Sequence, residues 1–459
     1  MLPRVFLLTG FVHHAYTLSI PRLPSLATFA ASSRVQQQQP LQDTLDAWIK
    51  HEERIALDKL LANVAPGGSN VQGKGVAEGT VIASPSQDGP DYWFQWVRDA
   101  AITMDTLVNI YADDPSSSRA SSLSIILDAY TSLQGDIQRT SNPSGTFDDL
   151  SGLGEPKFQV DGKPFTGSWG RPQRDGPALR ALTLMHYLRD ARSLKEGSHL
   201  ARTFGDFGAA DWYQKQAGYI ENLLGKFWNA QKGHLVETLW SKRSGLDCGL
   251  LLGSLHALPK SRSEDDVVYP PWSDEILVSL LALTRDQRDR FPINSNPSDQ
   301  DDDDDNIDEF TFQGTGLGRY PEDVYDGYGN SNRGGNPWFL CTSSAAEILY
   351  RTASHISATG NLTVTDVGLP FYESLLGSSS LDVDVGTFGP TDALFHSVIE
   401  RLQSTGDEFL QVVKTHVDAE GSMSEQFDRV TGYMRGAQHL TWSYGAFLQA
   451  ARARKISVH

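Results

Sequence analysis

The stretch that organises this chain is Tyr92-Trp93-Phe94-Gln95-Trp96-Val97-Arg98-Asp99, which follows a turn-rich run from Ala83 to Asp91. A helix is predicted to begin here with Asp99 in its first turn, because a carboxylate suits the positive end of the helix dipole. Flat aromatic faces beside a fixed Arg-Asp pair can bind a sugar ring, since its apolar faces stack and its hydroxyls find charged partners. For any one of these aromatic residues the alternative is simple burial in the core.

The composition narrows the class of protein. The chain has 459 residues, of which 39% are hydrophobic and 21% charged, which is typical of a soluble globular protein. A net charge of −18 argues against nucleic acid and anionic membranes as partners, because both attract basic patches. The two cysteines, Cys248 and Cys341, define neither a disulfide framework nor a metal cluster, and no cofactor is expected. Cys341 lies at an apolar helix start, where a buried, inert thiol is expected.

Residues 1–42 are expected to be a leader outside the folded domain. The apolar run Val5–Leu8 is too short to span a membrane and resembles an imperfect secretory signal, so a secreted protein is expected. A polar linker, Gln36–Pro40, follows. A glycosylation sequon begins at Asn361 and matters only if the chain is secreted. The aspartate run Asp301–Asp305 could bind calcium, but a solvated insertion is favoured because like charges repel.

The rest of the chain shows helical periodicity and no sustained alternation of strand type. Thr44 is a candidate N-cap for the first helix, and Asp175 for the fourth. Long loops rich in glycine and aromatic residues connect the helices, and loops of that length are usually functional. Helices are predicted over 45–64, 99–111, 121–139, 175–185, 212–228, 248–258, 273–291, 337–357, 391–417 and 440–453.

Four of these loops carry candidate site residues. They are the Tyr92–Asp99 segment, the Thr166–Pro177 segment around Trp169, the Gly318–Leu340 segment and the Gly421–Tyr444 segment. Taken alone, each has a plain structural explanation, such as a core aromatic, a structural ion pair or a solvated loop carboxylate. Together they supply aromatic platforms, arginines and a loop carboxylate, which is what a pocket for an oligosaccharide end requires.

All four loops resemble, in order, those of the fungal glucoamylases, glycoside hydrolase family fifteen, over about Leu45 to Ala453. The resemblance implies an all-α fold, the (α/α)6 toroid. We expect one catalytic domain over residues 43–459 and no starch-binding domain. The resemblance implies an inverting exo-hydrolase that releases β-D-glucose from the non-reducing ends of starch, glycogen and malto-oligosaccharides. It also implies a monomer that needs no metal.

The resemblance assigns roles by position. Glu425 resembles the general base that activates water, and Trp169 resembles the tryptophan beside the catalytic acid. The residues with an implied role in substrate binding are Tyr92, Trp96, Arg98, Asp99, Trp169, Arg171, Arg319, Trp338 and Trp442.

The chain departs from the family at the general acid. Glucoamylases carry this acid in a Leu-Trp-Glu-Glu segment, whereas the Glu-Glu pair of this chain is Glu52-Glu53, on the first predicted helix, and Trp-Glu does not occur. Family-like sequence stops near Arg189 and resumes near Arg192–Ser198, so the toroid is expected to lack about one helical hairpin. Three interpretations remain open: a hydrolase with impaired activity, a glucan-binding pseudoenzyme, and a misassembled product of a faulty gene model.

Overall fold

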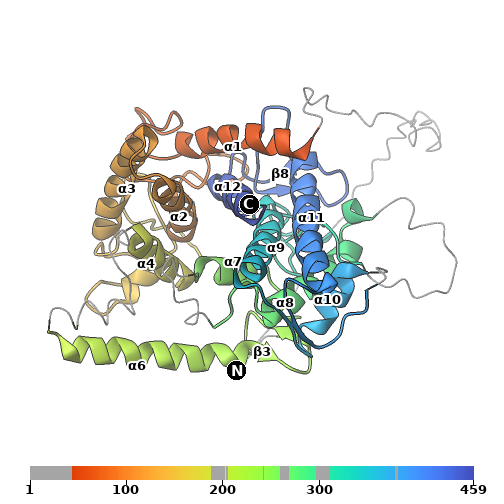
Figure 1. The fold of residues 1–459 in the computed structure, drawn as a ribbon. Coiled ribbons are helices and arrows are strands. Elements are labelled where there is room, and N and C mark those ends of the chain that lie inside the picture. Colours follow the sequence, from red (N-terminus) through yellow and green to blue (C-terminus); the bar gives the residue numbers. More distant parts are fainter. Residues whose placement is uncertain are drawn as a thin grey trace, which may run out of the picture. The chain divides into compact units, whose positions relative to one another are not determined.

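The protein consists mainly of helices joined by long loops (Figure 1). The structure, a computed structural model, describes residues 44–187, 202, 205–240, 242–258, 268–295, 311–377 and 381–458. Its α-helices are α1 (Leu45–Ala62), α2 (Val97–Asp113), α3 (Ser118–Ile137), α4 (Asp175–Tyr187), α6 (Phe207–Leu224), α7 (Gly249–His256), α8 (Asp274–Arg290), α9 (Phe339–Thr359), α10 (Leu369–Leu376), α11 (Ala393–His416) and α12 (Thr441–Ser457).

Local capping explains where several helices begin and end. The Thr44 hydroxyl accepts a hydrogen bond from the Ala47 amide at 3.2 Å, as predicted for the N-cap of α1. Ser117 caps α3 in the same way, accepting from the Ala120 amide at 3.1 Å. Helix α9 ends at Gly360, whose φ of 63° is accessible to glycine without a steric penalty.

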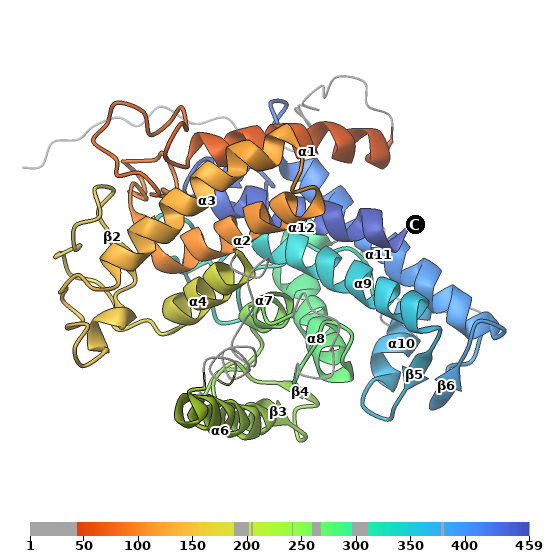
Figure 2. The ribbon, with the colours of Figure 1, turned by 60° about the vertical axis from the view of Figure 1, so that its left-hand side comes forward.

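The helices form an inner and an outer set. Helices α2, α9 and α12 are buried along most of their length, whereas α1, α3 and α11 bury one face. Contacts run from α4 to α2, from α2 to α12, from α12 to α9 and from α9 to α7. Helices α1, α3 and α11 pack on the outside of this series (Figure 2).

Short antiparallel hairpins shape the connecting loops. Strand β1 (Gln95–Trp96) pairs with β2 (Lys157–Phe158), and β7 (Gln426–Phe427) pairs with β8 (Met434–Arg435). The remaining pairs are β3 (Trp228–Asn229) with β4 (His234–Leu235), and β5 (Leu362–Val364) with β6 (Gly386–Phe388). The first two hairpins adjoin two of the predicted site residues, because β1 begins three residues after Tyr92 and β7 follows Glu425 directly.

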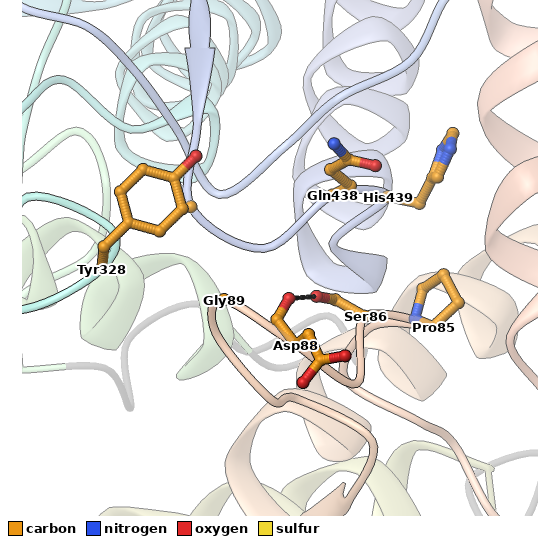
Figure 3. A pocket seen from close by; sticks show the side chains of 8 residues that line it. Pro85, Ser86, Asp88, Gly89, Tyr328, Gln438 and His439 are labelled. Carbon is orange, nitrogen blue, oxygen red and sulfur yellow. Dashed lines mark hydrogen bonds between the residues drawn. The ribbon is translucent and has the colours of Figure 1, made fainter.

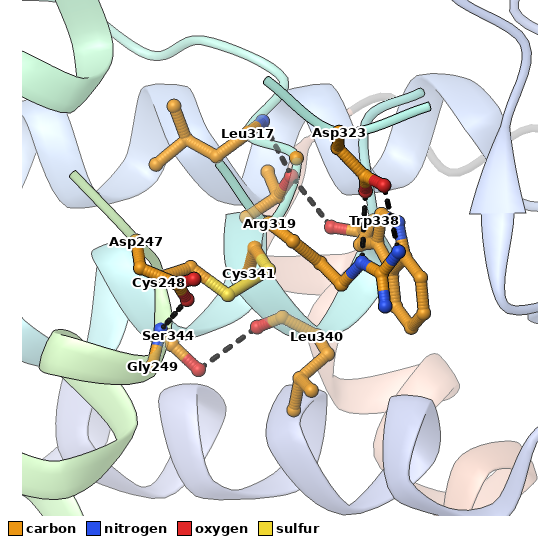
Figure 4. Close-up of a disulfide and its surroundings, with 12 residues drawn as sticks. Asp247, Cys248, Gly249, Leu317, Arg319, Asp323, Trp338, Leu340, Cys341 and Ser344 are labelled. Atoms are coloured by element: carbon orange, nitrogen blue, oxygen red, sulfur yellow. Dashed lines mark hydrogen bonds and ion pairs between the residues drawn. A yellow bond between two sulfur atoms is a disulfide. The ribbon is translucent and has the colours of Figure 1, made fainter. Parts of the chain in front are cut away.

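The prediction that Cys341 is a free, buried thiol is wrong. Cys341 and Cys248 form a disulfide with a Cα–Cα distance of 5.7 Å, and both residues are buried (Figure 4). They are 93 residues apart and meet because α7 packs against α9, a tertiary contact that the sequence does not reveal.

The predicted helices agree with the observed ones apart from their ends, and α10 was not predicted. The predictions for the leader 1–42, the aspartate run Asp301–Asp305 and the break between Arg189 and Ser198 lie outside the described residues. None of the helices in the described ranges combines the length and apolarity needed to cross a bilayer.

Candidate active site

Glu425 lies at the centre of the candidate site and is 1% exposed. The Tyr92 hydroxyl donates to its Oε1 at 2.8 Å, and the Tyr325 hydroxyl lies 3.0 Å from that of Tyr92. Within the described residues Oε2 has no hydrogen-bond partner. One oxygen of the carboxyl group is therefore fixed, and the other remains available for a ligand or a water molecule.

The ionisation of Glu425 depends on these neighbours. Burial raises the pKa of Glu425 to about 8, and the negative charge of Asp99 also raises it. The hydrogen bond from Tyr92, the neighbouring Tyr325 hydroxyl and the charge of Arg319 act in the opposite direction, because they favour the carboxylate. The tyrosines and Arg319 are thus the groups that favour the charged form of this buried carboxyl group.

An aromatic wall runs from Tyr92 through Trp96 to Trp169. The Tyr92 and Trp96 rings are 6.3 Å apart, and the Trp96 and Trp169 rings meet edge to face at 5.3 Å. Pairing of β1 with β2 fixes Trp96, whereas Trp169 lies on a glycine-flanked loop and is 45% exposed. The exposed indole face of Trp169 offers a platform for a sugar ring.

A second wall contains Arg319 and Trp338, which lie side by side (Figure 4), and the Trp338 ring is 6.3 Å from that of Tyr325. The Arg319 guanidinium lies 4.9 Å from the centre of the Trp338 ring and is held by two hydrogen bonds to the Asp323 carboxylate, at 2.7 and 2.8 Å. Trp338 is in turn 6.2 Å from Trp442. Arg319 and Asp323 therefore form an ion pair, and this pair holds the Arg319 guanidinium against the Trp338 ring.

Arg98 and Asp99 lie beside Trp442, at the start of α2. The Arg98 guanidinium is 5.7 Å from the Trp442 ring, its Nη1 donates to Asp175 at 2.6 Å, and its Nε lies 3.7 Å from Asp99. Burial raises the pKa of Asp99 to about 6, although Arg98 lowers it. Arg98 is thus partly bound by Asp175, whereas Asp99 Oδ2 has no hydrogen-bond partner among the described residues.

Five of the predicted site residues each have a buried polar atom without a hydrogen-bond partner in the described part of the chain. Buried polar groups normally have partners, so unpaired ones require an explanation. In the part of the chain that the structure describes, the unpaired buried atoms of these residues are Trp96 Nε1, Asp99 Oδ2, Trp338 Nε1, Glu425 Oε2 and Trp442 Nε1. Donors and acceptors of this kind match the hydroxyls of a sugar.

Arg171 occupies a different place from the other predicted residues. Its Nε donates to the buried Glu155 carboxylate at 2.8 Å, and its Nη2 donates to the Phe165 carbonyl at 2.9 Å. These contacts brace the loop that carries Trp169. A direct role for Arg171 in substrate binding stays a prediction.

Three neighbours of the site were not singled out as binding residues from the sequence. Tyr325 contacts Tyr92 directly, and Asp247 lies beside Arg319, where burial raises the pKa of Asp247 to about 6. Gly436 has a φ of 74°, and a Cβ there would come within 2.6 Å of Glu425 Oε2, so only glycine fits. These roles depend on contacts between distant loops, which local sequence patterns do not encode.

A small polar pocket lies on the other side of Gly436. It has a volume of about 230 Å³ and is lined by residues of the 85–89 segment together with Tyr328, Gln438 and His439 (Figure 3). The Ser86 hydroxyl donates to the Asp88 carbonyl at 3.0 Å and shapes one side. No group of three or more His, Cys, Asp or Glu side chains suited to a metal occurs in the described ranges.

Comparison with known proteins places the chain in a family. The profile of glycosyl hydrolases family 15 matches residues 54–191 and 188–452. A glucoamylase of Saccharomycopsis fibuligera is 33% identical over an aligned length of 493 residues, covering 89% of this chain and 90% of the relative. The glucoamylase of Neurospora crassa is 31% identical over 90% of this chain and 68% of its own length.

Solved structures agree in fold. A glucoamylase from Saccharomycopsis fibuligera superposes with a TM-score of 0.79 at 32% identity, covering 91% of this chain and 96% of that one. A family 15 glucoamylase from Hypocrea jecorina gives 0.77 at 33% identity, covering 90% of this chain and 72% of that one. The all-α (α/α)6 toroid expected from the resemblance is confirmed. The chain belongs to family 15 of the glycosyl hydrolases, the family of the glucoamylases.

Proposed function

We propose that the chain is an exo-acting glucan 1,4-α-glucosidase that releases β-D-glucose from starch, glycogen and malto-oligosaccharides with inversion. The unpaired polar atoms gathered around Glu425 are the observation that carries this proposal. A polar ligand bound there would satisfy these indole N–H groups and carboxylate oxygens, because buried polar groups normally have hydrogen-bond partners. The family and the names of its relatives support a glucan as that ligand.

The residues divide the work as follows. Glu425 accepts a proton from the water that attacks the anomeric carbon, while Tyr92 and Tyr325 favour its carboxylate form. Arg98 and Asp99 bind hydroxyls of the terminal sugar. The indoles of the two walls, together with Arg319, hold the neighbouring rings.

Inverting hydrolysis also needs a proton for the departing oxygen. We infer that this chain lacks the group that supplies it, because the family's acid-bearing segment is missing from the sequence. Two comparisons support this inference. The two matched ranges of the family profile meet at residues 188–191. The alignment with the Saccharomycopsis fibuligera relative is 493 residues long but covers only 89% of this 459-residue chain, so it includes positions that the chain lacks.

Starch hydrolysis tests this function. The wild-type chain should release glucose from soluble starch at least about a hundredfold more slowly than the Saccharomycopsis fibuligera relative, since loss of a general acid costs about 10²–10⁴ in rate. The Glu425→Gln variant, which keeps the shape of the side chain, should abolish the remaining hydrolysis. A rate equal to that of the relative would contradict the claim that the chain lacks a general acid. A residual rate that Glu425→Gln leaves unchanged would contradict the role of Glu425.

A glucan-binding pseudoenzyme is the second candidate, favoured by the missing acid alone. α-D-Glucosyl fluoride separates the two, because fluoride departs without needing a proton while water still needs a base. An enzyme with a working base hydrolyses this substrate, whereas a pseudoenzyme only binds maltotriose.

We also propose that the chain is secreted. The Cys248–Cys341 disulfide supports this location, because disulfides persist in oxidising compartments. Detection of the folded chain in the medium of a fungal host would agree with the proposal, and retention inside the cell would contradict it.

A further inference from the structure

The Lys157 ammonium is enclosed by aromatic rings from two separate loops. Its Nζ lies 4.0 Å from the centre of the Trp169 ring, 4.1 Å from Phe94, 4.1 Å from Phe165 and 4.9 Å from Trp96. A cation is attracted to an aromatic face within about 6 Å of its centre, so all four contacts count. Phe94 and Trp96 belong to the segment that contains β1, and Phe165 and Trp169 belong to the loop that precedes α4.

Strand pairing places Lys157 among these rings. Lys157 lies opposite Trp96 in the β1–β2 pair, and it is 3% exposed. The nearby Glu155 carboxylate pairs with Arg171. The four aromatic faces therefore join the charges of Asp91 and Glu155 in compensating for the burial of this cation.

The rings around Lys157 are also ordered relative to one another. Trp96 and Trp169 meet edge to face at 5.3 Å with an interplanar angle of 77°, and Phe94 and Phe165 do so at 5.2 Å and 74°. Each edge-to-face pair joins one loop to the other. Trp169 is otherwise half-exposed between two glycines, so these contacts decide its orientation.

We propose that Lys157 is a positioning residue of the glucan site, whose ammonium holds Trp96 and Trp169 in the orientation that receives a sugar ring. The proposal rests on the proposed function. Lys157 does not touch the substrate in this account. It keeps the wall ordered before the ligand arrives, so that binding does not have to order the Trp169 side chain.

The protonation state of Lys157 makes this role dependent on pH. Burial lowers the pKa of Lys157 to about 8, and Arg171 also lowers it, while Asp91 and Glu155 raise it. Below this pH the ammonium is present and the wall is held. Above it the cation is lost, and the attraction to the aromatic faces is lost with it.

The first test removes the charge. Lys157→Met keeps the length of the side chain, and we expect it to bind maltotriose about tenfold more weakly in calorimetry, with an altered near-ultraviolet circular dichroism of the tryptophan pair. Lys157→Arg keeps a cation and should restore binding to within about threefold. The matched control is Lys74→Met, because Lys74 is exposed and lies over a single ring, that of Trp93, at 4.9 Å.

A second measurement needs no destabilising substitution. Between about pH 6.5 and pH 9.5 the near-ultraviolet signal of the wild type should change with a midpoint near 8, and this change should disappear in Lys157→Arg, which stays charged. Glu425 also has a pKa of about 8, so a change that persists in Lys157→Arg comes from elsewhere and overturns the proposal. Wild-type maltotriose affinity in a folded Lys157→Met overturns it as well. Failure of the wild type itself to bind maltotriose would instead contradict the proposed function, and the spectroscopic test would still stand.

Discussion

At the scale of single residues, the site depends on contacts between side chains far apart in the sequence. Tyr92 and Glu425 are 333 positions apart and share a hydrogen bond. The residue types and their loops could be predicted from the sequence, because aromatic, arginine and carboxylate groups stand out beside helix ends. Tyr325, Lys157 and Gly436 could not, because their importance arises only from which neighbours they meet.

Tyr92→Phe tests how the base is tuned. The substitution removes the donor to Glu425 Oε1, so the pKa of Glu425 should rise further and less carboxylate should be present at a given pH. A hydrogen bond to a charged group contributes about 1.5–3 kcal/mol, so hydrolysis of α-D-glucosyl fluoride should fall about 10- to 100-fold under acidic conditions. The loss should shrink as the pH rises. Tyr328→Phe is the control, because Tyr328 is exposed, and pH profiles that coincide for Tyr92→Phe and the wild type would refute this tuning.

Trp169→Ala tests the aromatic platform. Removal of the half-exposed indole should weaken maltotriose binding at least about tenfold by calorimetry while leaving the unfolding transition almost unchanged. Trp240→Ala removes a more exposed tryptophan, 89% accessible and outside the cluster, and should leave affinity unchanged. Equal affinity in the two variants would remove Trp169 from the site.

At the scale of elements, apolar spacing was sufficient to locate most helices, because each buries a continuous face. The hairpins were missed, since strands of two or three residues are too short to show alternation. Helix α10 was missed as well. Helix α6, the first α-helix described after Arg189, exposes Phe207 at 62% and Trp212 at 58%.

The disulfide joins the starts of α7 and α9 beside Arg319 (Figure 4). It closes a loop of 93 residues, and removal of such a link costs about 2–5 kcal/mol of unfolding free energy. The double variant Cys248→Ser, Cys341→Ser should therefore unfold at a lower urea concentration than the oxidised wild type. Addition of a reductant should destabilise the wild type and leave the double variant unaffected. Coincident urea curves for the oxidised wild type and the double variant would contradict this role.

At the scale of the whole molecule, buried carboxyl groups should make the fold most stable under mildly acidic conditions. Burial raises the pKa of Glu52 and Glu425 to about 8, and that of Asp99 and Asp247 to about 6. A raised pKa means that the folded state holds the proton more tightly, so its stabilising effect is complete below the unfolded pKa and is lost as the pH rises through 6 to 8. His416 acts in the opposite sense, because burial lowers its pKa to about 4, and its contribution is lost as the pH falls toward that value.

His439 also has a pKa lowered by burial, but the carboxyl groups with raised pKa values outnumber these two histidines, which predicts a higher melting temperature at about pH 5 than at about pH 8. Glu52→Gln should reduce this difference, because Glu52 lies outside the site and its carboxyl no longer titrates. Differential scanning calorimetry at the two pH values checks the prediction. A melting temperature that is higher at the alkaline value would show that other groups dominate.

The central claim, that Glu425 activates water for an inverting attack on glucose, is tested most directly by proton NMR of α-D-glucosyl fluoride hydrolysis. This substrate needs no general acid, so the measurement isolates the base whether or not the acid segment is present. The account predicts that β-glucose forms first, and that Glu425→Gln lowers the rate by at least about a hundredfold. Formation of α-glucose first, or an equal rate in the wild type and Glu425→Gln, would contradict it.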